Sequence, residues 1–242
     1  MCFNSEATVA DTLASVRAQR LPPGVEVEHI VVDGGSTDAT MDLVRAAPGI
    51  RFVSERDRGL YDAINKGIRL ATGEVVGILN SDDVFDGEDA LAAVAEGFRA
   101  HPEADALYAD IRFVRGGRTV RYYSAAHWRP WMARWGYMVP HPSVYVKRGR
   151  FAELGGYSLD YDIAADFELM TRFFVRHRLP TAYLARSLVR MRPGGKSTAG
   201  WRAYLKANRE NVRALRANGI RSCLLMMLPK YLYKTLGLCV RR

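Results

Sequence analysis

Three apolar segments in the first third of the sequence each lead into a cluster of acidic and small polar residues. The segments are residues 27–32, 50–53 and 75–79, and the clusters after them contain Asp33, Asp57 and Asp82-Asp83. Amphipathic stretches of roughly 10–15 residues separate the segments, as in chains that alternate strands and helices to form a covered parallel sheet. Open sheets of this kind bind ligands beside the carboxyl ends of their strands. The sequence therefore predicts one polar ligand site there.

The rest of the chain gives a coarser pattern. We expect helices after Ser5, from about 36 to 47, from 60 to about 72, after 87, at 164–177 and from 201, a hairpin of 105–114 with 119–123, and strands at 143–146 and 181–189. The first four residues, Met1 to Asn4, are typical of the end of a β-strand, so we expect residual strand character at 1–3. No internal repeat is visible.

The charge of the chain is unevenly distributed. The formal net charge is +9, but residues 1–100 carry −8 and residues 201–242 carry +9. An acidic first part argues against nucleic acid as a partner. The basic and apolar tail suits either an anionic membrane surface or a helix docked on the protein's own core or on a partner subunit, and a solvated basic surface is also compatible with it.

Several classes of protein are excluded or disfavoured. The sequence has no apolar run long enough for a membrane span, no signal-peptide pattern at its start, and only three cysteines, which indicates a reducing compartment. Its five histidines show no zinc-site spacing, and no Gly-x-Ser-x-Gly elbow occurs. The stretch 194–197 resembles the end of a phosphate-binding loop, but Arg190 stands where that loop needs its first glycine.

The pair Asp82-Asp83 has two interpretations from the residues alone. Adjacent carboxylates after an apolar strand are unfavourable unless they are solvated, paired or bound to a metal. Mg²⁺ or Mn²⁺, which prefer oxygen ligands, would link such a pair to a diphosphate. The alternative is a pair of turn or capping aspartates before the helix that follows Gly87.

The clusters taken together resemble a known family. The segments 31–38, 54–67 and 80–83, followed by 141–143, 155–157 and 165–170, are similar in order and spacing to family 2 glycosyltransferases of the GT-A fold. The resemblance covers roughly residues 1–195. It implies an α/β domain over 1–195, with a Rossmann-like, mostly parallel sheet sandwiched by helices, and a helical, basic and amphipathic extension over 196–242.

The resemblance also implies roles for individual residues. Asp33 matches the contact to the nucleotide base, Asp57 matches the second acidic contact, and Asp166 matches the catalytic base. The implied donor-nucleotide site consists of Asn4, Glu6, Asp33, Asp57, Lys66, Asn80 and Asp82, and the implied site for Mn²⁺ or Mg²⁺ consists of Asp82 and Asp83. Asn80 departs from the family pattern, because the motif usually has its first aspartate there. From the local sequence alone, Asp166 could also cap the helix that follows.

Further residues are expected on the acceptor side. We expect Trp135, His141, Arg192 and Lys196 near the acceptor or on a loop that closes over the phosphates. The aromatic residues Trp128, Trp131, Trp135 and Tyr137 could stack on sugar rings of the acceptor, although packing is the favoured interpretation for most of them.

The resemblance thus implies an inverting glycosyltransferase of cell-surface polysaccharide biosynthesis. We expect a nucleotide-sugar donor, with UDP as the nucleotide, and a glycan or polyprenyl-diphosphate-linked acceptor. The expected location is the cytoplasm, with possible peripheral contact to the inner face of the cytoplasmic membrane. One alternative is a catalytically inactive nucleotide-sugar-binding or regulatory protein of the same fold. Another is a nucleotidyltransferase, which would need a glycine-rich basic loop that residues 1–20 lack.

Overall fold

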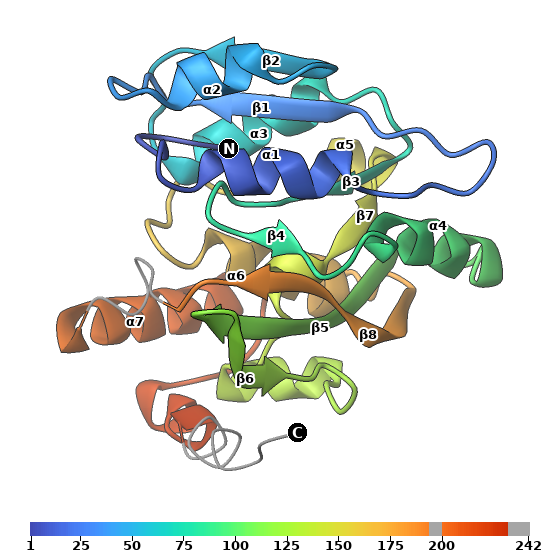
Figure 1. The fold of residues 1–242 in the computed structure, drawn as a ribbon. Helices are drawn as coiled ribbons and strands as arrows, with labels where there is room; N and C mark the ends of the chain where they lie inside the picture. The colour runs from blue at the N-terminus through green and yellow to red at the C-terminus, as the bar shows by residue number, and fades with distance from the viewer. Residues whose placement is uncertain (194–199, 232–242) are drawn as a thin grey trace.

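The computed structural model describes residues 1–193 and 200–231, and its elements stack in two blocks (Figure 1). The N-terminal block, residues 1–70, holds two parallel strands, β1 (His29–Asp33) and β2 (Ile50–Ser54), with α1 (Val9–Arg17), α2 (Thr40–Ala46) and α3 (Leu60–Leu70). The strand character expected at residues 1–3 is present as a single parallel bridge between Cys2 and Asp33.

The main block, residues 75–193 and 200–231, is built on a six-stranded sheet. Five strands lie in the order β3 (Val75–Gly77), β7 (Tyr145–Lys147), β5 (Ala106–Arg115), β8 (Thr181–Met191) and β4 (Val84–Phe85), and β6 (Arg118–Tyr123) pairs with β5. The helices of this block are α4 (Ala90–Ala100), α5 (Gly149–Leu154), α6 (Ala165–Met170), the π-helical turn η3 (Thr171–Arg176) and α7 (Trp201–Ala217), with short 3₁₀ turns η1 (Pro130–Trp135), η2 (His141–Ser143) and η5 (Leu224–Met227).

The α/β architecture agrees with the expectation, but the pairing of the strands is mixed rather than mostly parallel. Only β1 with β2 and β5 with β8 run parallel, and the other four pairs are antiparallel. One reason is local: Gly116 and Gly117 both adopt positive φ and join β5 directly to β6 by a tight hairpin, which only antiparallel strands can use. The alternation of strands and helices that predicts a parallel sheet ends near residue 100.

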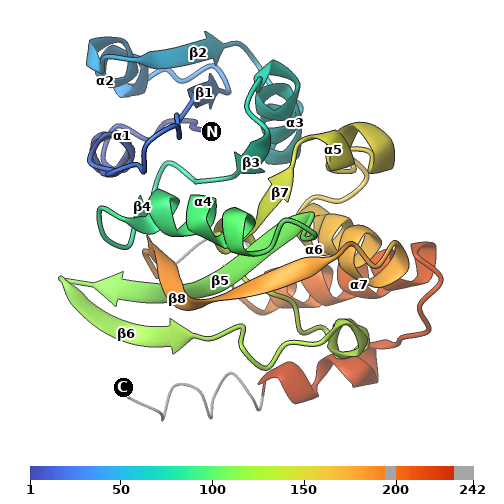
Figure 2. The ribbon, with the colours of Figure 1, turned by 90° about the vertical axis from the view of Figure 1, so that its right-hand side faces the viewer.

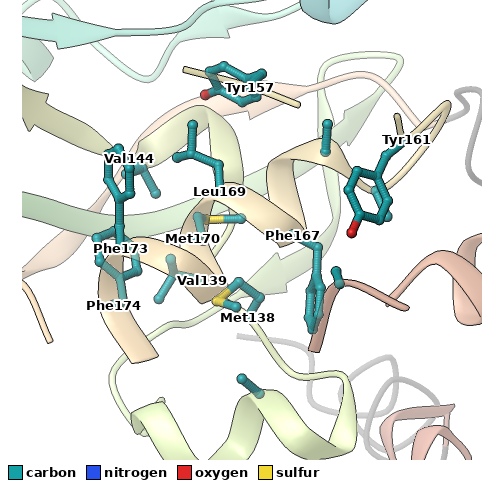
Figure 3. Packing of buried hydrophobic residues seen from close by; sticks show 14 of the residues in the cluster. Met138, Val139, Val144, Tyr157, Tyr161, Phe167, Leu169, Met170, Phe173 and Phe174 are labelled. Atoms are coloured by element: carbon teal, nitrogen blue, oxygen red, sulfur yellow. The ribbon is translucent and has the colours of Figure 1, made fainter. Parts of the chain in front are cut away.

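The largest core cluster surrounds α6 and η3, where Leu169, Phe173 and Phe174 are almost completely buried (Figure 3). The helix expected at 164–177 is present as α6 continued by η3. Helix α7 adds Ala214 and Leu215, both fully buried, to the same cluster. The helix at the start of the predicted extension is therefore packed into the core that supports α6.

Candidate active site

The loop after β1 is organised by the carboxylate of Asp33, which is fully buried. Its Oδ2 accepts hydrogen bonds from the backbone N–H groups of Gly35 and Ser36 at 3.1 and 3.0 Å and from the Ser54 hydroxyl at 2.6 Å. Burial raises the pKa of Asp33, but these hydrogen bonds and the one from the Ser36 hydroxyl outweigh it, so the pKa lies below its usual range. Asp33 is therefore a charged group that fixes the start of this loop.

Asn4 and Glu6 hold the same loop from the other side. The Asn4 Oδ1 accepts from the Thr37 N–H at 2.9 Å, and the Glu6 carboxylate accepts from the Ala39 N–H at 2.9 Å. Both residues are exposed. The structure thus brings together three of the residues predicted for the donor site, Asn4, Glu6 and Asp33.

The loop after β2 meets this first loop through Asp57, whose side chain is only 6% exposed. Lys66 of α3 lies 2.5 Å from the Asp57 carboxylate and 2.8 Å from Glu55, and hydrogen bonds to these two carboxylates raise the pKa of Lys66. A Cβ at Gly34 would lie 3.3 Å from the Asp57 carboxylate. Asp57 and Lys66 therefore form an ion pair directly beside the Asp33 loop.

The loop after β3 places the two candidate metal ligands, Asp82 and Asp83, in different environments. Asp82 is exposed, whereas Asp83 is 1% exposed and accepts a hydrogen bond from the Asn80 amide at 2.8 Å. Burial raises the pKa of Asp83 to about 7, although the hydrogen bond from Asn80 opposes the shift. A bond of 2.8 Å between the hydroxyls of Ser5 and Ser81 joins this loop to the first one.

The donor set at Asp82 is suited to a cation that is shared with a substrate. Mg²⁺ is usually held by one or two carboxylates together with substrate phosphates rather than by a closed protein cage. Within residues 1–193 and 200–231 no group of three or more acidic, histidine or cysteine side chains forms such a cage. The exposed carboxylate of Asp82 fits a cation bound jointly with a diphosphate, and the buried Asp83 fits a supporting role through Asn80.

Asp166 lies at the second position of α6, and the N-cap of that helix is Ala164, which makes no side-chain cap. Asp166 is therefore not the N-cap of this helix, which was the alternative role that the sequence allowed for it. Its Oδ1 accepts from the Phe167 N–H at 2.7 Å and lies 3.5 Å from the Tyr61 hydroxyl, which donates to the Ile163 carbonyl at 2.5 Å. The carboxylate is half-buried at the start of this helix.

Two stacked tyrosines and a histidine surround Asp166. The rings of Tyr61 and Tyr157 are 5.7 Å apart and nearly parallel, and the Tyr157 hydroxyl shares a hydrogen bond of 2.6 Å with Nε2 of His141. Burial lowers the pKa of His141, although the charge of Asp166 opposes the shift. The imidazole is thus held neutral, and His141 acts here as a hydrogen-bond partner of Tyr157.

Asn65 of α3 holds Tyr157 in this position. The Asn65 amide donates to the Tyr157 carbonyl and accepts from its N–H, both at 2.8 Å. A Cβ at Gly156 would come within 2.3 Å of the Asn65 Oδ1, so this contact requires glycine. Arg172 donates to the carbonyls of Gly155 and Gly156 while forming an ion pair with Glu168. Sequence reasoning included Asn65 in the segment 54–67 and Tyr157 in the segment 155–157, but it did not predict a contact between them.

A side chain of α7 fixes the backbone just before Asp166. The buried Glu210 carboxylate accepts from the N–H groups of Ile163 and Ala164 at 2.9 and 3.0 Å. Glu210 lies in the segment that the sequence assigns to the extension, and no local motif marks it. Its partners are 46 to 47 residues away in sequence, which explains why the sequence does not reveal it.

The residues predicted for the acceptor side are dispersed. Arg192 is exposed and pairs with Asp11 of α1, and Trp135 is half-buried at the end of η1. Lys196 lies outside the described residues. Trp128 is buried with its indole N–H donating to the Tyr137 carbonyl, as the packing interpretation expects. Among the described residues no direct contact joins Asp82 to Asp166.

Comparison with known proteins identifies the family. The model of glycosyl transferase family 2 matches residues 1–152. The chain belongs to this family. It is 34% identical over 164 residues to a "PGL/p-HBAD biosynthesis glycosyltransferase" of Mycobacterium tuberculosis, which covers 66% of this chain and 62% of that protein. It is also 35% identical over 115 residues to the poly-beta-1,6-N-acetyl-D-glucosamine synthase of Staphylococcus epidermidis, which covers 46% of this chain and 27% of the synthase. The chain thus spans about 62% of the length of the mycobacterial relative.

Solved structures show the same fold. Staphylococcus aureus TarS in complex with UDP-GlcNAc matches with a TM-score of 0.65 at 18% identity, covering 88% of this chain and 64% of that one. The mannosyltransferase PcManGT of Pyrobaculum calidifontis, in complex with GDP-Man and Mn²⁺, also matches with a TM-score of 0.65, at 21% identity, covering 98% of this chain and 67% of that one. This family 2 chain therefore has the GT-A fold.

Proposed function

We propose that this protein is an inverting glycosyltransferase that moves a sugar from a nucleotide-sugar to a glycan or a polyprenyl-diphosphate-linked acceptor. The observation that supports this most strongly is the half-buried carboxylate of Asp166 at the start of α6, beside Tyr61, in a family 2 chain. The loops that hold Asp33, Asp57 and Asp82 form the donor side of the proposed site.

The carboxylate of Asp166 acts as the general base in this proposal. It accepts the proton of the acceptor hydroxyl as that oxygen attacks the anomeric carbon from the face opposite the departing diphosphate, which inverts the configuration. A positioned base of this kind contributes about 10²–10⁴-fold to the rate. The leaving diphosphate needs no protonation, so one carboxylate suffices. Tyr61, whose ring stacks on Tyr157, lies beside Asp166.

A Mg²⁺ or Mn²⁺ ion held by Asp82 would stabilise the negative charge that develops on the leaving diphosphate. The exposed carboxylate of Asp82 would bind this cation and orient it toward the diphosphate. The buried Asp83 accepts a hydrogen bond from Asn80 and thereby fixes the shape of the loop. On the nucleotide side, the nucleobase would lie against two loops. These loops are held by Asn4, Glu6, Asp33 and the ion pair between Asp57 and Lys66.

The donor and the pathway are also part of the proposal. TarS was solved with UDP-GlcNAc and with UDP, which favours a UDP-sugar, whereas PcManGT was solved with GDP-Man. The name of one relative, a poly-beta-1,6-N-acetyl-D-glucosamine synthase, favours synthesis of a polysaccharide as the pathway, and we propose that this polysaccharide belongs to the cell surface. Trp135, His141, Arg192 and Lys196 remain the residues proposed for the acceptor side.

The proposed site of action is the cytoplasmic face of the membrane. The side chains of Leu224, Leu225 and Leu228 are exposed, and the sole acidic residue of the segment 200–231, Glu210, is buried. Exposed leucines among arginines favour contact with an anionic bilayer. None of the helices in residues 1–193 and 200–231 is long and apolar enough to cross a bilayer.

Vesicle sedimentation tests this contact. The full chain is expected to sediment with vesicles that contain anionic lipid, and the double variant Leu225→Glu, Leu228→Glu is expected to stay in the supernatant. Val120→Glu, which changes an exposed residue of β6, serves as the matched control. Equal sedimentation of all three proteins would refute the role of these leucines.

A donor assay tests the proposed activity. The protein is incubated with UDP- and GDP-sugars and a lipid-linked or oligosaccharide acceptor, with Mn²⁺ or Mg²⁺, and the product is examined by NMR. The expected product carries the inverted anomeric configuration, with release of the nucleoside diphosphate. Binding of the nucleotide-sugars without release of diphosphate under any of these conditions would favour the inactive binding protein instead.

A further inference from the structure

Four strands of the main sheet bring one row of side chains together. Val84 of β4 lies opposite Arg190 of β8. Arg190 lies opposite Arg112 of β5, and Arg112 lies opposite Tyr122 of β6. Residues directly opposite each other on neighbouring strands point to the same face of the sheet. Two arginines therefore lie side by side between β4 and the hairpin of β5 with β6, which projects past β4 in Figure 2.

This row lies at the edge of the sheet that carries the proposed active site. β7 runs antiparallel to both β3 and β5, and β8 runs parallel to β5, so β3, β5 and β8 all end at the same edge. Asp82, the proposed cation ligand, is two residues before Val84. Because neighbouring strands are about 4.8 Å apart, the backbone of Arg112 lies roughly 10 Å from that of Val84. One substrate can therefore reach from the cation loop to both arginines.

A second connection joins β5 to the surroundings of Asp166. The Ser143 hydroxyl, in the turn η2, donates to the Ala109 carbonyl of β5 at 2.6 Å. His141 begins the same turn and belongs to the group of rings beside Asp166. Arg112 follows three residues after Ala109. The arginine pair thus lies in the main block with Asp166, whereas the loops proposed to hold the nucleotide belong to the N-terminal block.

The two arginines share a single carboxylate. Asp86, whose side chain is 7% exposed, accepts hydrogen bonds from Nε and Nη2 of Arg112, and Nε of Arg190 lies 3.7 Å from it. Among the described residues no other acidic side chain forms an ion pair with either arginine. The sequence from 111 to 152 contains nine arginines and lysines and neither Asp nor Glu. One positive charge of the pair therefore stays uncompensated in the part of the chain that the structure describes.

The arrangement is unfavourable without a further anion. Like charges directly opposite each other on neighbouring strands repel. The side chains of Arg112 and Arg190 are 39% and 46% exposed, and within residues 1–193 and 200–231 neither Nη1 donates a hydrogen bond. Arginine donates paired, charge-assisted hydrogen bonds to phosphate oxygens. Two guanidinium groups with free N–H donors on one face are therefore suited to a diphosphate.

The strand beside the pair is fixed by a buried carboxylate. Asp110, which is 3% exposed, accepts from the hydroxyls of Tyr122 and Tyr183 at 2.7 and 2.9 Å and from the Ala125 N–H at 2.7 Å. These bonds hold β6 against β5 next to Arg112. The arginines are thus carried by strands that are already held in place, as a binding subsite requires.

We propose that Arg112 and Arg190 form a subsite for a diphosphate group of the acceptor, which is therefore anionic. The inference rests on the proposed function, because it assigns a part of the acceptor of that reaction. The group bound here does not react. It anchors the acceptor so that a sugar hydroxyl lies at Asp166, while the donor diphosphate lies at Asp82. A prenyl diphosphate and a diphosphate without a lipid share this chemistry.

Binding of farnesyl diphosphate tests the subsite, with inorganic pyrophosphate and the neutral alcohol farnesol as further probes. The titrations are made in EDTA, so that no cation holds a probe at Asp82. The unmodified protein is expected to bind farnesyl diphosphate and not farnesol. Arg190→Gln is expected to weaken this binding roughly tenfold or more, because charge-assisted hydrogen bonds to the diphosphate are lost. Arg118→Gln, which removes an exposed arginine of the same hairpin, is the matched control and is expected to keep the affinity.

Two further measurements separate this subsite from the fold and from the donor site. Arg190→Gln is expected to keep its Tm, since Arg112 retains its two hydrogen bonds to Asp86. The Kd of UDP, measured with Mn²⁺, is expected to be unchanged as well. Equal weakening of UDP and farnesyl diphosphate would overturn the proposal, because Arg190 would then belong to the donor site. Equal losses in Arg190→Gln and Arg118→Gln would also overturn it, as would binding of farnesol as tight as that of its diphosphate.

The source of the diphosphate and the fate of the proposed function are read from the same experiments. Pyrophosphate that binds as tightly as farnesyl diphosphate supports recognition of the diphosphate alone, and tighter binding of farnesyl diphosphate supports a lipid-linked acceptor. A protein that binds the prenyl diphosphate through Arg190 but transfers no sugar would lose the proposed function and keep the subsite. A protein that transfers sugar to a neutral acceptor, at a rate unchanged by Arg190→Gln, would keep the function and lose the subsite.

Discussion

The two blocks of the molecule are stabilised in different ways. In the N-terminal block the buried cluster is small, with Val9, Val31 and Val44 among its members, and Asp33 finds its partners within a few residues or on the adjacent strand. In the main block a large aromatic cluster, to which α3 also contributes, supports α6, and the surroundings of Asp166 come from segments far apart in sequence. The first block thus depends on loop hydrogen bonds, whereas the second depends on packing.

The largest expected effect compares the two cores. Phe173→Ala in the main block is expected to lower the free energy of unfolding by about 3–5 kcal/mol, because it removes a fully buried ring. Val44→Ala in the N-terminal block, also fully buried, removes two methyl groups and is expected to lower it by about 2 kcal/mol. Urea titration followed by circular dichroism measures both. Equal losses would contradict the difference between the blocks.

A smaller effect is expected at the contact that positions Tyr157. Gly156→Ala places a methyl group against Asn65 and is expected to destabilise the fold by about 1–3 kcal/mol, the usual range for overpacking. It also displaces Tyr157 from Asp166, so kcat should fall while donor affinity is kept. Gly149→Ala, where nothing lies within 4 Å of the added Cβ, is the control. Unchanged kcat in Gly156→Ala would remove Tyr157 from the positioning of Asp166.

The smallest effect concerns pH and the N-terminal block. Burial lowers the pKa of His29 to about 4, so between its unfolded value of about 6.5 and pH 4 the unfolded chain binds a proton that the folded chain does not. The contribution of His29 to the free energy of unfolding is therefore fully present above pH 6.5 and is lost as the pH falls to 4. Relative to His29→Gln, the unmodified chain should lose about 1–2 kcal/mol over that window, allowing for partial exposure. Parallel stability curves for the two proteins from pH 7 to pH 4 would contradict the assignment.

The sequence predicts the N-terminal block well because its signals are local. The loop of Asp33 is organised by Gly35 and Ser36, which lie within three residues of it, and the helix and strand boundaries there agree with the expected ones to within a few residues. The two glycines of the turn also predict the hairpin of β5 with β6. The short elements β4 and α5 carry no periodic pattern and are absent from the sequence-based prediction.

The surroundings of Asp166 could be predicted only in part. The family resemblance assigns roles to Asp166 and His141. It includes Tyr61 and Asn65 in the segment 54–67 without a role, and it does not extend to Glu210. These three residues contact this region from 46 to 105 residues away in sequence. The mixed pairing of the large sheet was missed for the same reason. Strand order depends on contacts between distant segments, which local periodicity does not contain.

The carboxylate of Asp166 is the group on which the proposed mechanism depends, and Asp166→Asn tests it most directly. The amide keeps nearly the same size and cannot accept the proton of the acceptor hydroxyl. The donor Kd, measured by calorimetry with Mn²⁺ present, is expected to stay within a few-fold of the unmodified protein, while kcat for sugar transfer falls by roughly 10²-fold or more. Transfer at the normal rate with unchanged donor affinity would contradict the assignment of Asp166 as the base.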